Sequence, residues 1–207
     1  MIKYFAKNNI RISNCGAEYS DAGVYLDAND NTKLYCVGQS FIKSYLDSQY
    51  DTESRDAFLV PYFVQNGIHM VSAAFSRSLV AVLDEHGNVY MFGTGGRHQM
   101  GDGNGENTKN GEVVCVPLFK EEKIRIVEIM LGAFHVCAKS ANGDYYVWGC
   151  DDDCQLSGLC DCGKCPKVGV SVVRPHRVQF PDYIDRDQVV QLYMGGYMSC
   201  VVVDQST

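Results

Sequence analysis

Apolar and polar residues alternate in short runs along most of this chain. The pattern is clearest in residues 124–149, where one alternating run is followed by a second at 135–139 and a third at 145–148. Alternation with a period of two is typical of a half-buried strand. Asn142-Gly143 separates the last two runs, and this pair favours a tight hairpin because both residues tolerate positive φ. The segment therefore predicts three short antiparallel strands.

The same layout recurs on both sides of this segment. The equivalent runs are 10–16, 23–26 and 34–38, then 70–74, 78–83 and 89–93, and finally 189–195 and 198–203. Three sets of landmarks repeat with them: Gly16, Ala74, Gly132 and Gly195 are spaced by 58, 58 and 63 residues, Gly38, Gly93 and Gly149 by 55 and 56, and Pro61, Pro117 and Pro175 by 56 and 58. Because three landmarks share one period, the chain contains an internal repeat. A repeat of this length made of a few short strands predicts a propeller blade or a related radial array.

Four short motifs follow one another in the third copy of the repeat, and three of them recur in the second. The third copy has Gly132-Ala133-Phe134-His135, Tyr146-Val147-Trp148-Gly149, Gln155-Leu156 and Pro175-His176-Arg177-Val178, and the second has Tyr90-Met91-Phe92-Gly93, Gln99-Met100-Gly101-Asp102-Gly103 and Pro117-Leu118. In this order the motifs resemble the regulator of chromosome condensation repeat family, over residues 10–204. The chain departs from the family at the histidine after the glycine, which is present at His135 and replaced by Tyr19, Arg77 and Met198 in the other copies.

The resemblance implies an all-β fold, a β-propeller of the regulator of chromosome condensation type. We expect one propeller-repeat domain over residues 1–207, with about three and a half repeats at 10–64, 69–118, 124–178 and, incomplete, 189–204. The family forms seven-bladed propellers, so this chain would supply about half a ring. A half ring leaves apolar blade faces open. The chain is then a fragment of a longer protein, a partial ring completed by a partner, or one of two copies that close a ring; we favour the first two.

The first nine residues allow two interpretations. Ile2 and Tyr4 have apolar neighbours and are compatible with a strand that completes a last blade. The alternative is a frayed terminus.

Charge and hydropathy narrow the range of partners. The net charge is −7, with 18 basic and 25 acidic residues. Because binding to duplex nucleic acid depends on Lys and Arg at the phosphates, this balance argues against direct nucleic-acid binding and favours a protein partner with a basic face. No run approaches the roughly 18 apolar residues of a membrane span. No secretory leader is visible, so we expect an intracellular protein, cytoplasmic or nuclear.

Half of the ten cysteines lie within residues 150–165. Four of them, Cys154, Cys160, Cys162 and Cys165, form a candidate structural zinc site, because zinc accepts thiolate ligands at short spacing. Only Cys162 and Cys165 have the usual spacing, and the alternative is a loop of free, reduced thiols kept soluble by its aspartates. The remaining five lie in predicted strands, where we expect them to be small buried apolar residues: Cys15, Cys36, Cys115, Cys137 and Cys200.

Other candidate sites match known binding or catalytic motifs only in part or not at all. The glycines that follow Phe92 match no nucleotide-binding fingerprint, since no helix pattern follows them. Asp102-x-Asn104-x-Glu106 alternates oxygen ligands as calcium loops do but lacks the rest of the set, which favours a solvated turn. No histidine has a Ser, Cys or carboxylate partner at a spacing that suggests a catalytic triad. We expect His135 to form hydrogen bonds between blades, and we expect no catalytic residues, no cofactor and no enzyme.

The resemblance implies a protein–protein interaction module that contacts its partner through loops at one rim. The family includes guanine-nucleotide exchange factors for the small GTPase Ran, so regulation of a small GTPase is the first hypothesis. The second is a structural or accessory subunit of a large assembly without exchange activity. A third is a metal-dependent regulator that uses the 150–165 loop. No exchange residue is mapped onto this sequence, and neither a membrane nor a small-molecule role has support in it.

Overall fold

The computed structural model describes residues 3–17, 23–38, 57–77, 79–93, 96–104, 112–153, 155–156, 171–180, 182 and 184–204. The chain forms two compact units. Unit 1 comprises Met1–Thr94 and Asn107–Val116, and unit 2 comprises Gly95–Glu106 and Pro117–Thr207.

The described residues of unit 1 form two antiparallel sheets of four strands, each in chain order. The first is β1 (Ile12–Ala17), β2 (Gly23–Asp27), β3 (Leu34–Val37) and β4 (Phe58–Leu59), and the second is β5 (Met70–Ser76), β6 (Leu79–Asp84), β7 (Val89–Gly93) and β8 (Val114–Cys115). Their facing surfaces share one hydrophobic core, in which Val24 and Leu34 of the first sheet cluster with Val80 and Phe92 of the second. All four of these side chains are fully buried.

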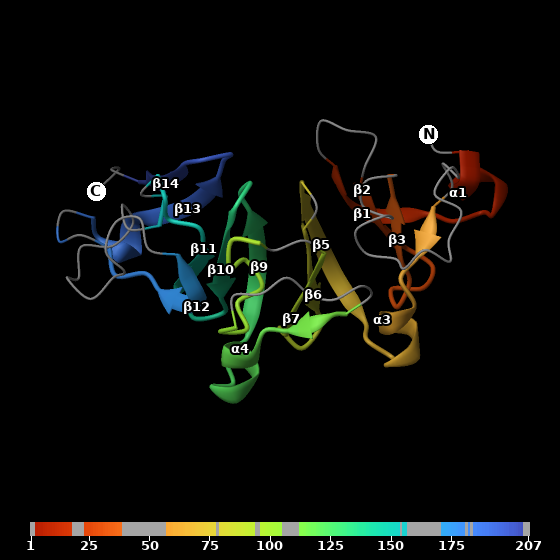
Figure 1. Cartoon of the computed structure of the whole chain (residues 1–207), viewed down its shortest axis with the longest axis horizontal. Coiled ribbons are helices and arrows are strands. Elements are labelled where there is room, and N and C mark those ends of the chain that lie inside the picture. The colour runs from red at the N-terminus through yellow and green to blue at the C-terminus, as the bar shows by residue number, and fades with distance from the viewer. Residues whose placement is uncertain are drawn as a thin grey trace. The chain divides into compact units, whose positions relative to one another are not determined.

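In the described part of unit 2, the strands form one four-stranded sheet and one two-stranded sheet (Figure 1). The strands are β9 (Ile126–Leu131), β10 (His135–Ser140), β11 (Tyr145–Gly149) and β12 (Val172–Arg177), followed by the short 3-10 helix η2 (Arg186–Gln188), β13 (Val189–Met194) and β14 (Ser199–Val203). Strands β9, β10, β11, β13 and β14 lie in the predicted runs, whereas β12 was not predicted. Gly143 has the positive φ of 79° expected at the hairpin turn. The prediction of an all-β fold is confirmed.

The repeat is visible in details of the backbone. The first strand of every sheet has a register shift at the same place, after Ile12, Met70, Ile126 and Val189. The glycines that follow or end the third strands, Gly38, Gly93 and Gly149, have φ values of 122°, 106° and 106°. This left-handed region favours glycine, which explains why the sequence repeats glycine there.

A one-turn helix precedes the first strand of three repeats, and sequence analysis missed all three. They are α1 (Lys3–Lys7), α3 (Pro61–Gln65) and α4 (Pro117–Glu121). Each buries one phenylalanine against a tyrosine of the third strand: Phe5 on Tyr35 at 5.6 Å, Phe63 on Tyr90 at 5.9 Å and Phe119 on Tyr146 at 5.5 Å between ring centroids. For residues 3–9 both interpretations were therefore wrong, because the contact of Phe5 with Tyr35 stabilises a helical turn there; Ile2 lies outside the described residues.

The three prolines that share the repeat period are not structurally equivalent. Pro61 and Pro117 each begin a helix, where a residue without an N–H group loses no hydrogen bond. Pro175 instead lies within β12, the last strand of its sheet, where an edge position also tolerates the missing N–H.

The cysteines in strands differ in exposure. Cys36 and Cys137 are buried as expected, and burial raises the pKa of both thiols. Cys115 is half-buried and Cys200 is exposed, so the expectation of burial was wrong for these two. Cys15 lies in β1. Among the described helices, none combines the length and apolar character of a membrane span.

Candidate functional site

Two tight turns of unit 2 lie side by side at one end of its strands. The N–H of Gly132 donates to the carbonyl of His135 at 2.8 Å, and the N–H of Gly195 donates to the carbonyl of Met198 at 2.9 Å. The N–H of Ala133 donates to the carbonyl of Gly195 at 3.3 Å and so joins the two turns. The turn before β10 and the turn before β14 therefore form one surface.

Gly132 is required by the close approach of its neighbours. A Cβ atom at this position would lie 2.3 Å from Cε1 of His135 and 2.7 Å from the backbone oxygen of Gly195. Contacts this short do not occur between real Cβ atoms and their neighbours, so a side chain here would displace the imidazole or the next turn. The glycine that marks the repeat in the sequence thus makes room for the histidine that follows it.

Below this surface, His135 of β10 links its sheet to the two-stranded sheet of β13 and β14. Its Nε2 lies 3.2 Å from the hydroxyl oxygen of Ser199, and that hydroxyl donates its proton to the carbonyl of Gln155 at 2.7 Å. The serine oxygen therefore accepts from Nε2–H, which assigns this tautomer to the neutral imidazole. Burial lowers the pKa of His135 to about 4, so the ring is neutral at pH 7. The expected hydrogen bond between neighbouring repeats is present.

The glutamine of the preceding repeat makes a related bridge. The amide of Gln99 donates to the carbonyl of Ala133 at 3.2 Å, and the backbone carbonyl of Gln99 accepts from Nε1 of Trp148 at 2.7 Å. Gln99 and Gln155 are 56 residues apart, and each reaches the sheet of the following repeat. Through these hydrogen bonds, the loop that follows the third strand of one repeat packs against the sheet of the next repeat. The bonds therefore hold in place the side chains that the loop exposes.

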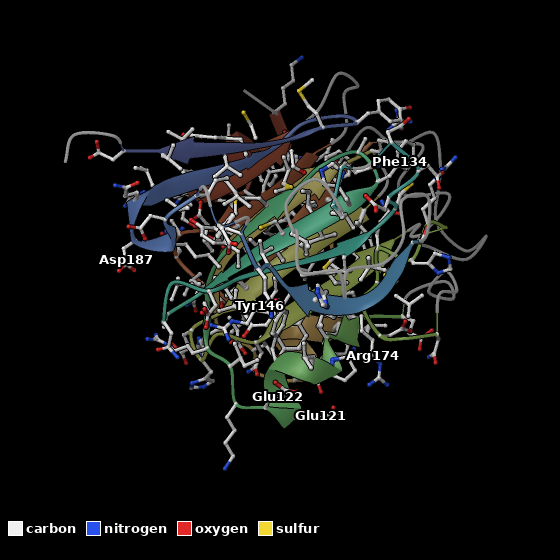
Figure 2. All side chains as sticks on the ribbon, turned by 90° about the vertical axis from the view of Figure 1, so that its left-hand side faces the viewer. Glu121, Glu122, Phe134, Tyr146, Arg174 and Asp187 are labelled. Atoms are coloured by element: carbon white, nitrogen blue, oxygen red, sulfur yellow. The ribbon has the colours of Figure 1, made fainter. Side chains whose placement is uncertain are left out.

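An arginine, two aromatic rings and an aspartate meet on this fixed surface; we call Arg97, Phe134, Asp152 and Tyr197 the rim cluster. The guanidinium carbon of Arg97 lies 4.9 Å from the centre of the Phe134 ring. The Phe134 and Tyr197 rings lie 5.5 Å apart between centroids. Arg97 also forms an ion pair with Asp152 and lies 3.5 Å from the sulfur of Cys150. Figure 2 shows Phe134 at the end of unit 2 away from Glu121, the last residue of α4, and from Glu122.

The rim cluster has the composition and exposure of a protein-binding surface. The side chains of Arg97 and Asp152 are 49% and 51% exposed, and Tyr197 is 54% exposed. Next to Tyr197, Met198 is exposed as well. Arginine, tyrosine, phenylalanine and methionine are enriched in interface cores, and rigid aromatic rings dominate their binding energy. Because Asp152 already pairs with Arg97 and Asp153 is exposed beside it, the surface is not basic.

The predicted site residues are only partly described. Cys154, Cys160, Cys162 and Cys165 lie outside the described residues, as does Glu106 of the candidate calcium loop. Within that loop the carboxylate of Asp102 accepts from the backbone and the side-chain amide of Asn104 at 2.9 and 3.1 Å, as expected for a turn. In the part of the chain that the structure describes, no group of three or more His, Cys, Asp or Glu side chains could hold a metal ion.

Sequence reasoning did not identify the rim cluster. Phe134 belongs to a repeat motif, and Arg97 lies in a loop that was noted for its glycines. Their contact depends on two bridges between residues distant in sequence, so no local pattern predicts it. The spacing of Gln99 and Gln155 is the signal that would have located the loops involved.

Known proteins are similar to this chain in sequence over part of its length and in fold over most of it. Protein pim1 of Schizosaccharomyces pombe is 33% identical over 72 residues, which is 35% of this chain and 13% of that protein. The crystal structure of human WBSCR16 superposes with a TM-score of 0.69 over 96% of this chain at 19% identity. Prp20p from Saccharomyces cerevisiae, described with its binding to Gsp1p and histones, superposes at 0.66 over 98% at 18% identity. No family model matches the chain.

The chain spans less than half of each of these structures, 46% of WBSCR16 and 44% of Prp20p. A second structure contains yeast RCC1 (Prp20) bound to Kap60 and superposes with a TM-score of 0.66 at 16% identity. Similarity at this level of identity establishes the fold. The chain has the β-propeller fold of regulator of chromosome condensation (RCC1) repeats.

Proposed function

We propose that this protein is a protein–protein interaction module that contacts its partner through the rim cluster. The observation that carries the proposal is the half-exposed stack of Arg97, Phe134 and Tyr197, which the neighbouring repeats hold in place. Two matches support a binding role, since Prp20p is described with Gsp1p and histones and, in a second structure, with Kap60. The module acts by binding and carries out no chemical step on its own.

The finer proposal is that the partner is a small GTPase whose nucleotide exchange the module regulates. The family resemblance suggests this activity, and an exchange factor of this kind needs no catalytic side chain. The partner would present a basic face, because the chain carries a net charge of −7 and exposes Asp152 and Asp153 beside the aromatic rings. The alternative is an accessory subunit of a large assembly without exchange activity.

Affinity purification of the tagged chain from its own cells tests the proposal when three forms are compared. Tyr197→Ala removes an exposed ring of the rim cluster and should abolish recovery of the specific partner. Tyr193→Ala is the matched control, because this tyrosine is 59% exposed on β13 and lies outside the rim cluster. Equal recovery with all three forms would overturn the role of the rim cluster.

The identity of the recovered protein decides between the two functions. A small GTPase at near-stoichiometric yield leads to a nucleotide-release assay, in which the wild-type chain should accelerate release and Tyr197→Ala should not. Recovery of large-complex subunits without a GTPase would indicate the accessory role and contradict regulation of exchange.

A further inference from the structure

Four described residues other than glycine have a positive φ, and one of them lies beside the rim cluster. Asn9 and Lys123 follow the helices α1 and α4 by two residues, where a left-handed residue commonly ends a helix. Arg77 lies in the turn between β5 and β6. His98, with a φ of 65°, lies instead in the loop after β7. The left-handed region is unfavourable for a residue with a Cβ atom, so this conformation needs a cause.

The two neighbours of His98 contact consecutive residues of one turn. Arg97 stacks on the ring of Phe134, and the side-chain amide of Gln99 donates to the carbonyl of Ala133 at 3.2 Å. A residue in a helical conformation, of either hand, advances the chain less than an extended residue does. The conformation of His98 therefore lets both neighbours reach the turn before β10.

The Nδ1 atom of His98 does not stabilise this conformation. It is buried and, in the part of the chain that the structure describes, has no hydrogen-bond partner. A strained backbone conformation persists where the contacts around it impose it. We attribute the conformation of His98 to the contacts of Arg97 and Gln99, which hold the chain on both sides of it.

We propose that His98 is a positioning residue of the rim cluster, and that its left-handed backbone holds the Arg97 guanidinium on the Phe134 ring. The guanidinium carbon lies 4.9 Å from the centre of that ring, and Arg97 also pairs with Asp152. Ordering a long side chain at an interface costs conformational entropy, so an arginine that is already held loses less freedom when a partner binds. This benefit to binding rests on the proposed function, whereas the position of Arg97 does not.

Gln99 and Arg97 differ in how firmly they are held. Gln99 is 3% exposed, and its backbone carbonyl accepts a hydrogen bond from the indole of Trp148. The side chains of Arg97 and Asp152 are half-exposed, and solvent screens an ion pair of this kind. A residue at position 98 that disfavours the left-handed region should therefore release Arg97 and leave Gln99 in place.

Asparagine and valine at position 98 provide a matched pair of variants. Both His98→Asn and His98→Val remove the imidazole, but asparagine tolerates the left-handed region and the β-branched valine does not. Cys150 reports the position of Arg97, because its sulfur is buried and lies 3.5 Å from the guanidinium. Labelling of the folded chain with iodoacetamide, followed by mass spectrometry, should modify Cys150 about tenfold faster in His98→Val than in His98→Asn. Cys137 is fully buried in β10 and should stay unmodified in both variants.

Arg97→Gln tests whether His98 acts through Arg97. This variant should itself speed the labelling of Cys150, and His98→Val should add less than about twofold to it, because two residues that act through one contact do not have additive effects. Affinity purification gives a second measurement. The protein that copurifies with the wild-type chain should be recovered normally with His98→Asn and poorly with His98→Val.

Four results would each overturn the proposal. They are equal labelling of Cys150 in the two variants at position 98, an equal rise in the labelling of Cys137, a rate for Cys150 that Arg97→Gln leaves unchanged, and the full effect of His98→Val in the Arg97→Gln background. A different result would contradict only the proposed function. In that case Cys150 responds as expected, but Arg97→Gln and Tyr197→Ala leave recovery of the partner unchanged, so that His98 positions Arg97 without a role in binding.

Discussion

The indole Nε1 of Trp148 donates a hydrogen bond of 2.7 Å to the backbone carbonyl of Gln99, 49 residues earlier in the chain. The bond fastens the loop after β7 to the third strand of the next sheet. One repeat later, Ser199 donates to the carbonyl of Gln155 at 2.7 Å, so a different side chain uses the equivalent carbonyl. The backbone carbonyl of this glutamine thus accepts a hydrogen bond in both repeats, whereas the side chain that donates the bond differs between them.

Trp148→Phe should destabilise unit 2 by about 2 to 4 kcal/mol, because it removes the hydrogen bond to Gln99 and leaves a cavity in a buried site. Trp148 is fully buried and packs on Phe119 at 5.9 Å. Denaturant unfolding followed by circular dichroism measures the change. Tyr197→Phe is the control and should change the free energy of unfolding by less than about 0.5 kcal/mol, since this ring is exposed. Equal effects of the two substitutions would contradict a special role for the bridge.

Gly132→Ala should cost about 2 to 3 kcal/mol, because the added methyl group would overlap the His135 ring and the oxygen of Gly195. Gly196→Ala provides a matched comparison, since a Cβ atom there meets nothing within 4 Å. The free energy of unfolding should be nearly unchanged in this second variant. If both variants were equally stable, Gly132 would not be needed for the close approach of the two turns.

The sequence predicted those features of the fold that repeat with a local pattern. Alternating runs and the glycines at 38, 93 and 149 locate the strands and their ends, because strand periodicity and positive φ are properties of a few neighbouring residues. The short helices α1, α3 and α4 were missed, since one turn gives no helical period and depends on a phenylalanine packing against a distant tyrosine. The short strands β4 and β8 were missed because two residues show no alternation. Strand β12 was also missed, because Pro175 interrupts its run.

The sequence predicted less of the candidate site than of the fold. His135 was expected to link neighbouring repeats, and its contact with Ser199 does so. The rim cluster was not predicted, because Arg97 and Phe134 meet only after the Gln99 bridge has folded its loop onto the next sheet. Exposure of Cys200 was also unexpected, since a strand pattern alone does not show which face another sheet covers.

Arg97→Gln should leave the free energy of unfolding unchanged within error, because its ion pair with Asp152 is half-exposed and screened by solvent. Recovery of the partner should nevertheless fall, since the variant removes the guanidinium that stacks on Phe134. Arg177→Gln is a matched control, because Arg177 pairs with Asp144 and is 53% exposed at the opposite end of β10. A loss of stability without a loss of binding would indicate that Arg97 has a structural role only.

Cys200 should react with a maleimide within the first minutes of exposure, whereas Cys36 and Cys137 should react only after unfolding. The first thiol is exposed, and burial both shields the other two and raises their pKa. Mass spectrometry after a short labelling pulse reports each cysteine separately. Comparable labelling of Cys137 and Cys200 in the folded chain would contradict the covered face in the third sheet and the open face in the last one.

The stability of unit 2 should fall as the pH decreases from about 6.5 toward 4. Burial lowers the pKa of His135 from 6.5 to about 4, so between these values the unfolded chain binds a proton that the folded chain does not. The stabilisation is complete above the unfolded pKa, and about 2 kcal/mol of it should be lost between pH 8 and pH 5.

Unfolding of the wild type and of His135→Met at these two pH values isolates this contribution, because methionine occupies the equivalent turn position at residue 198 and does not titrate. The carboxyl group of Asp30, whose pKa is lowered to about 2 chiefly by its hydrogen bond with Thr32, titrates below this window in the folded chain of both proteins. The variant should therefore show a smaller loss of stability between pH 8 and pH 5. An identical loss in both proteins would mean that His135 is already solvated in the folded state, and that the fastening of the two turns rests on the backbone bonds of Gly132, Ala133 and Gly195.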